Sequence, residues 1–69
     1  MTIIEVYDEN ELNLSNAMLF DERKDAEEHF AALIRNHLQN KCSKSDIEAY
    51  IKKGYYRDSR SFHVRIKDF

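Results

Sequence analysis

The chain of 69 residues contains no proline, no tryptophan, one glycine and one cysteine. Because Cys42 stands alone, an internal disulfide and a chelating pair of cysteines for zinc are excluded. A single glycine also excludes a glycine-rich phosphate-binding loop. Apolar runs such as Ala17–Phe20 are far too short to span a bilayer, and Met1–Tyr7 lacks the basic start and long apolar stretch of a signal peptide. We therefore expect a cytoplasmic protein without membrane contact.

What the chain has in quantity is charge. Charged residues make up 35% of it, yet the formal net charge is only −2. A hydrophobic content of 42%, with 12% aromatic residues, is enough for a folded core. A chain of this length buries only about 60% of the surface that its unfolded form exposes, which leaves no room for a second core. We therefore predict one small globular domain over residues 1–69 and exclude multidomain enzymes.

The charges are distributed unequally along the chain. Residues 1–34 contain nine acids and two bases, whereas residues 35–69 contain nine bases and four acids. The small net charge therefore hides a dipolar molecule. A surface dominated by one sign of charge attracts a partner of the other sign, so this asymmetry bears on partners rather than on the fold.

Three segments have the residue pattern of β-strands. Thr2–Tyr7 is rich in β-branched and aromatic residues and is followed by residues that favour a turn. Residues 13–20 end in an apolar stretch and are long enough to return antiparallel to the first segment. Residues 61–69 alternate between apolar and polar side chains, which is the period of a half-buried strand.

A first helix is predicted between the second and third strands, from an N-cap at Asp21 to about Asn40. Acidic residues crowd its first two turns, where the helix dipole favours negative charge. Its apolar side chains recur at steps of three and four residues and form one stripe. The stripe consists of Ala26, Phe30, Leu33, Ile34, His37 and Leu38.

A second, shorter helix follows. Ser43 or Ser45 is its N-cap, and Ser45 with Glu48 matches a capping box. Lys52 and Lys53 lie in its last turn, and Gly54 supplies the left-handed residue that ends a helix. After it, residues 55 and 56 are expected to lead into a polar bend at 57–60.

These elements predict an α+β fold of order ββααβ, in which two helices pack on one face of a three-stranded, mainly antiparallel sheet. The helices are expected to cover Ile4, Val6, Met18, Phe20, Phe62, Val64 and Ile66. The other face then carries an apolar patch of Ile3, Tyr7 and Leu19. Such a patch is typical of an interface, here a homodimer through the sheet face, although scattered surface hydrophobes explain it equally well.

The sequence contains no recognisable catalytic or metal-binding constellation. His29 and His37 are separated by about 12 Å along a helix, which is too far for two ligands of one ion. His63 and Cys42 are better explained as packed or half-exposed side chains. We therefore predict no metal, no cofactor and no catalytic residue, and we expect that the protein is not an enzyme.

A basic and aromatic segment near the C-terminus indicates a nucleic-acid interface. Cations contact phosphates and exposed rings stack on the bases of a single strand. The candidate residues are Lys52, Lys53, Tyr56, Arg57, Arg60, His63, Arg65 and Lys67. Against this interpretation, the two lysines also suit a helix end, the aromatic residues also suit a core, and the pI of 5.9 is low for a nucleic-acid binder.

The acidic residues of the first half are candidates for a negatively charged binding surface. Helix capping and solubility explain much of them, but they can also form a surface that docks on a basic partner protein. The candidate protein-binding residues are Asp8, Glu9, Glu11, Glu22, Asp25 and Glu28.

The layout of the chain carries one resemblance. Its size and the segments FDERKDAEEHFAALI, SDIEAYIKKGYY and SFHVRI, between Phe20 and Ile66, resemble the very short acidic proteins of bacteriophages and mobile elements, some of which are anti-CRISPR inhibitors. The resemblance implies binding to a larger protein without catalysis, and it assigns no role to individual residues. The sequence thus predicts a non-catalytic accessory or inhibitor protein directed at a host or defence protein, with a single-stranded nucleic-acid-binding module as the alternative.

Overall fold

A computed structural model describes residues 1–7, 14–58 and 62–69. Its elements are strand β1 (Thr2–Tyr7), strand β2 (Leu14–Phe20), helix α1 (Arg23–His37), helix α2 (Lys44–Lys53), strand β3 (Tyr55–Arg57) and strand β4 (His63–Asp68). The α+β class and the two helices are as predicted from the sequence. Neither described helix has the length and hydrophobicity that crossing a membrane requires.

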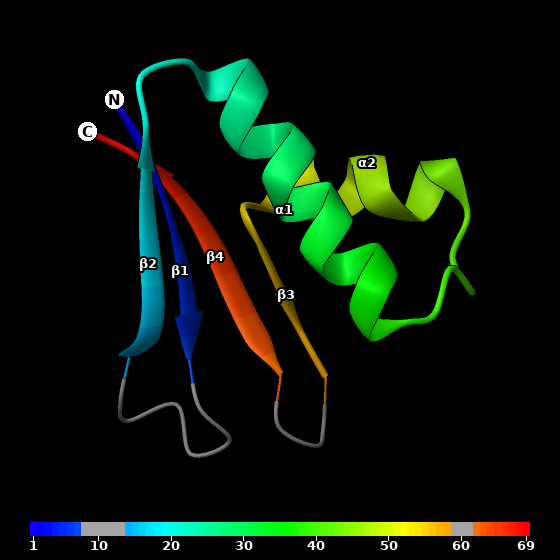
Figure 1. Cartoon of the computed structure of the whole chain (residues 1–69). Coiled ribbons are helices and arrows are strands. Elements are labelled where there is room, and N and C mark those ends of the chain that lie inside the picture. Colours follow the sequence, from blue (N-terminus) through cyan, green and yellow to red (C-terminus); the bar gives the residue numbers. More distant parts are fainter. Residues whose placement is uncertain (8–13, 59–61) are drawn as a thin grey trace.

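The strands form one antiparallel sheet in the order β2-β1-β4-β3 (Figure 1). The prediction of three strands is wrong, because Tyr55 and Tyr56 do not lead into a bend but form β3. Gly54, at φ +88°, turns the chain out of α2, and the next three residues pair with β4. Three residues are too few to show a strand period in the sequence, so only the pairing reveals this strand.

Both helices lie on the same side of the sheet, and the core fills the space between (Figure 1). Phe30 and Ile34 of α1 are completely buried against Ile4 of β1 and Val64 of β4. Alternate residues of β1 and β4 point into this core because successive side chains of a strand face opposite ways. The predicted apolar stripe of the first helix is therefore confirmed at its centre.

Met18 is an exception to the predicted helix-covered face. Its side chain is 40% exposed, although its strand partner Ile4 is buried. The start of α1 covers the end of β2, where the rings of Phe20 and His29 lie 5.4 Å apart. Met18 lies one pleat further along this edge strand, where the helix layer no longer protects it.

The helix ends differ in detail from the prediction. Helix α1 begins after Glu22, which makes no side-chain cap, and not after Asp21. Helix α2 has a capping box between Ser43 and Asp46, so the alternative box from Ser45 is wrong. The C-cap at Gly54 is left-handed, as predicted.

The two ends of the chain are joined at one corner of the sheet. The Thr2 hydroxyl donates to a carboxylate oxygen of Asp68 at 2.6 Å, and the other oxygen accepts from Arg23 at 2.8 Å. The hydrogen bond from Thr2, followed by the charge of Arg23, lowers the pKa of Asp68 below its ordinary value. This cluster connects β1, α1 and β4.

Candidate functional site: the open face of the sheet

The helices leave one side of the sheet uncovered, and we call this side the open face. Side chains of all four strands lie on it, and the strand pairing is regular except for a register shift between β1 and β2 at Val6 and Tyr7. Among the described residues it carries Ala17 and Leu19 of β2, Ile3, Glu5 and Tyr7 of β1, His63, Arg65 and Lys67 of β4, and Tyr55 and Arg57 of β3. Ile3, Tyr7 and Leu19 thus lie on the face predicted for them, but they share it with basic residues.

The centre of the open face is a cluster of rings from three neighbouring strands. Tyr7 of β1 is paired with His63 of β4, and their ring centroids are 5.2 Å apart. Tyr55 of β3 approaches the same imidazole edge-on at 6.3 Å. The Arg65 guanidinium lies 5.9 Å from the centre of the Tyr7 ring. Sequence positions 7, 55, 63 and 65 therefore form one aromatic and cationic platform.

The charge of this face is mainly positive. Among the described residues of this face, the acidic one is Glu5. Its side chain is 15% exposed and pairs with Lys67 at 3.5 Å. Lys67 remains half exposed, Arg57 is exposed, and Arg65 is partly so. Three cations thus accompany one largely covered carboxylate on a protein whose net charge is negative.

The edge of the sheet at β3 continues this surface into a hollow of about 440 Å³. The hollow is lined by Tyr50, Lys53, Tyr55, Tyr56 and Arg57. Tyr55 and Arg57 also belong to the open face, so the cationic surface bends around the edge towards α2.

Tyr56 is the main correction among the predicted nucleic-acid-binding residues. It pairs with Val64 and faces the helices, where its side chain is only 8% exposed. Its ring meets that of Tyr50 edge-on at 4.8 Å. Burial, and then the negative charge of Asp58, raises the pKa of the Tyr56 hydroxyl above its ordinary value of 10.0. Alternation in β3 exposes Tyr55 instead.

The other predicted basic residues are divided between two surfaces. Arg57, His63, Arg65 and Lys67 are brought together on the open face. Lys52 and Lys53 end α2 in the helix layer, and Arg60 lies outside the described residues. The sequence pattern missed Tyr7 and Tyr55 as platform residues, because their proximity to His63 depends on strand pairing.

The predicted acidic surface is described only in part. Glu22, Asp25 and Glu28 are exposed at the start and along the outer side of α1, as expected. Arg23 and Lys24 interrupt them, and Arg23 pairs with Glu27 at 2.9 Å. The remaining candidates, Asp8, Glu9 and Glu11, lie outside the described residues.

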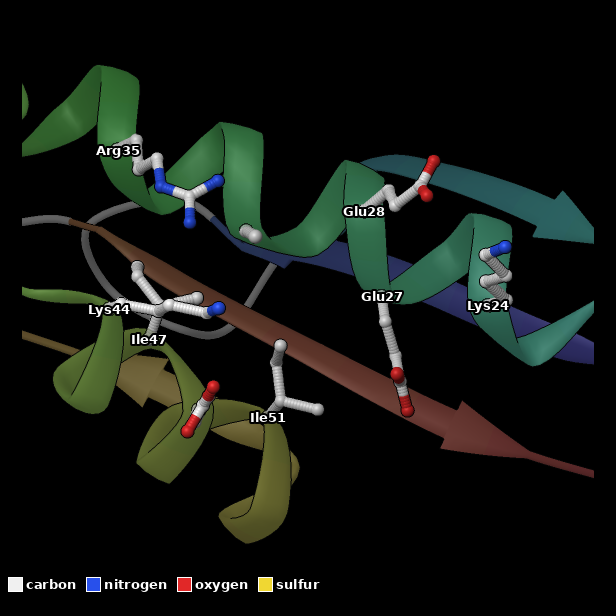
Figure 2. A pocket seen from close by; sticks show the side chains of 9 residues that line it. Lys24, Glu27, Glu28, Arg35, Lys44, Ile47 and Ile51 are labelled. Atoms are coloured by element: carbon white, nitrogen blue, oxygen red, sulfur yellow. The ribbon is translucent and has the colours of Figure 1, made fainter.

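A groove of about 290 Å³ separates α1 from α2 on the helix side of the molecule. Arg35 and Lys44 lie at one end of it, and Lys24, Glu27 and Glu28 lie at the other (Figure 2). Its apolar floor includes Ile47, which is almost completely buried. The groove therefore combines an apolar floor with charges of both signs at its rim.

His37 and Cys42 have structural surroundings. The His37 ring stacks on Phe62 at 4.2 Å and is hydrogen-bonded to the Asp58 carboxylate, which ties the end of α1 to the β3–β4 hairpin. Cys42 is a half-buried free thiol. Within the described ranges, no three His, Cys, Asp or Glu side chains are placed to hold one metal ion.

Comparison of the chain with protein-family models, curated proteins and solved structures finds no match. The layout resemblance to small phage inhibitors therefore stays a prediction. The open face, which gathers rings and cations from three strands, is the candidate site.

Proposed function

We propose that the protein is a binding module that holds single-stranded nucleic acid on the open face of its sheet. The observation that supports this function is the convergence of Tyr7, His63 and Tyr55 from three adjacent strands. Exposed rings stack on unpaired bases, and each stacked base contributes about 1–3 kcal/mol. Cations at the same surface contact the phosphates between the bases.

The arrangement of the rings favours bases that lie on the platform and not between its rings. The Tyr7 and His63 centroids are 5.2 Å apart and tilted by 31°, so no base fits between them. A base resting on them is adjacent to Arg65, which also contacts Tyr7. Single-stranded nucleic acid meets these requirements because its bases are free to turn towards a protein surface.

The acidic pI is compatible with this function because the charges are segregated. Glu22, Asp25 and Glu28 belong to the helix layer, on the opposite side from the platform. The open face itself carries Arg57, Arg65 and Lys67. With three phosphate contacts, the logarithm of affinity is expected to fall with a slope of about −2 against the logarithm of salt concentration.

Fluorescence anisotropy with labelled single-stranded DNA and RNA at low salt tests the proposal. Arg57→Gln removes an exposed cation from the open face, and Arg35→Gln removes an exposed cation from the helix groove. We expect only the first substitution to weaken binding and to flatten the salt dependence. No binding at low salt, or equal effects of the two substitutions, would refute the proposal.

A second candidate is the protein-binding accessory or inhibitor function expected from the sequence. The observation in its favour is that Glu22, at the N-cap of α1, and Asp25 and Glu28 within the helix are all exposed. Replacing the three with lysine should abolish binding to a basic partner protein while circular dichroism shows an intact fold. Affinity capture with and without nuclease separates the candidates, because a protein partner persists after nuclease whereas one recruited through nucleic acid is lost.

A further inference from the structure

Strand β2 is an edge strand with little of the usual protection, because its register shift against β1 is confined to its start, between Leu14 and Asn16. It lies at one end of the described sheet and is seven residues long, and its sequence LSNAMLF contains no charge and no proline. Edge strands offer unpaired backbone N–H and C=O groups, and soluble proteins normally protect them with charge, proline, a bulge or shortness. The opposite edge shows this protection, since β3 has three residues and includes Arg57.

The side chains of β2 indicate that something pairs with this edge. Met18 is 40% exposed on the helix side of the sheet and Leu19 is 60% exposed on the open face. These are two of the five large hydrophobic side chains exposed among the described residues. A strand added at this edge would contact both Met18 and Leu19, because its side chains lie on both faces of the sheet.

We infer that β2 pairs antiparallel with β2 of a second copy of this chain, across a two-fold axis, to form a continuous eight-stranded sheet. A second copy is the favoured occupant because the edge is self-complementary. With the axis at Met18, the two Met18 side chains are opposite each other, and each Leu19 is opposite the small Ala17 of the other copy. A symmetric contact also satisfies both unprotected edges with a single interface.

The electrostatics of the edge support the same partner. Uncharged β2 offers nothing to attract an acidic or basic foreign strand, whereas two copies meet there without like charges at the contact. The core of this small chain is limited, and added apolar burial is a stabilisation that small domains commonly gain by self-association. An axis perpendicular to the sheet leaves both helix layers on one side and both open faces on the other.

Sedimentation equilibrium over a concentration series tests the inference on the full chain. The wild-type protein is expected to show a monomer–dimer equilibrium. Met18→Lys places two like charges directly opposite each other and removes apolar burial, so it should weaken the dimer about tenfold. Ala32→Lys, at an exposed position of α1, is the matched control and should leave the equilibrium unchanged.

A mixing experiment tests the register itself. Met18→Glu alone should weaken the dimer as Met18→Lys does, and a mixture of the two variants should associate more tightly than either variant alone, because opposite charges then face each other. A wild-type monomer at every concentration, an unchanged dimer of Met18→Lys, or folded variants that fail to associate when mixed would each overturn the inference.

A covalent test applies if either charged variant is unfolded by circular dichroism. Met18→Cys in a Cys42→Ser background puts two thiols opposite each other, within reach of a disulfide. Mild oxidation is expected to yield a cross-linked dimer, and persistence of the monomer would overturn the inference.

Discussion

Tyr55 and Tyr56 are adjacent in sequence and face opposite sides of β3, so they offer a direct test of the structure. Tyr56 is 8% exposed and contacts Tyr50, whereas Tyr55 is 47% exposed on the open face. Tyr56→Ala removes a buried ring, a change that costs about 3 kcal/mol when the cavity is not refilled. That is a large part of the roughly 3–10 kcal/mol expected for a domain of this size.

Tyr55→Ala removes an exposed ring from an edge strand, and its cost should stay below about 1 kcal/mol. Its effect should appear in binding, where losing one stacking partner lowers affinity for a single strand about 5-fold to 150-fold. Urea unfolding followed by circular dichroism measures the first effect and fluorescence anisotropy the second. For Tyr56→Ala, the unfolding midpoint temperature should fall by roughly 12–24 °C.

Tyr56→Ala should lower stability, whereas Tyr55→Ala should lower binding with little loss of stability. If Tyr55→Ala destabilised the fold as much as Tyr56→Ala, the assignment of the two faces of β3 would be refuted. If Tyr55→Ala left both properties unchanged while the wild-type protein bound nucleic acid, the platform would not be the binding surface.

Three further predictions concern stability. Gly54→Ala should lower the free energy of unfolding, measured in urea, by about 1 kcal/mol, and Gly54→Asn should lower it by less. The cost comes from the backbone, because φ at this position is +88° and an added Cβ would meet its nearest atom at an ordinary 3.5 Å. Since the pKa of Tyr56 is raised in the fold, the stability of the wild-type protein should fall as pH rises above 10.0. Between pH 9 and pH 11, the unfolding midpoint temperature of the wild type should therefore fall relative to that of Tyr56→Phe. The pKa of Asp68 is lowered, so Asp68→Asn should destabilise at neutral pH, and its deficit should shrink as pH falls below 3.8.

Local sequence patterns were sufficient where one element decides the outcome. The strand Thr2–Tyr7 and the C-cap at Gly54 were predicted as the structure has them. The choice of N-cap on α2 was not, because Ser43 and Ser45 both have an acid three residues later and only the backbone path selects Ser43. The fourth strand was missed because three residues contain too little periodicity.

By itself, the sequence determined the class of fold, the helix stripe and the separation of acidic and basic halves, since these follow from residue spacing within single elements. Only the tertiary structure decided which residues share a surface. Strand order and register place Tyr7 beside His63 and put Tyr56 in the core, although β1 is far from β4 in the chain. Such contacts depend on pairing between distant segments, and no local pattern specifies that pairing.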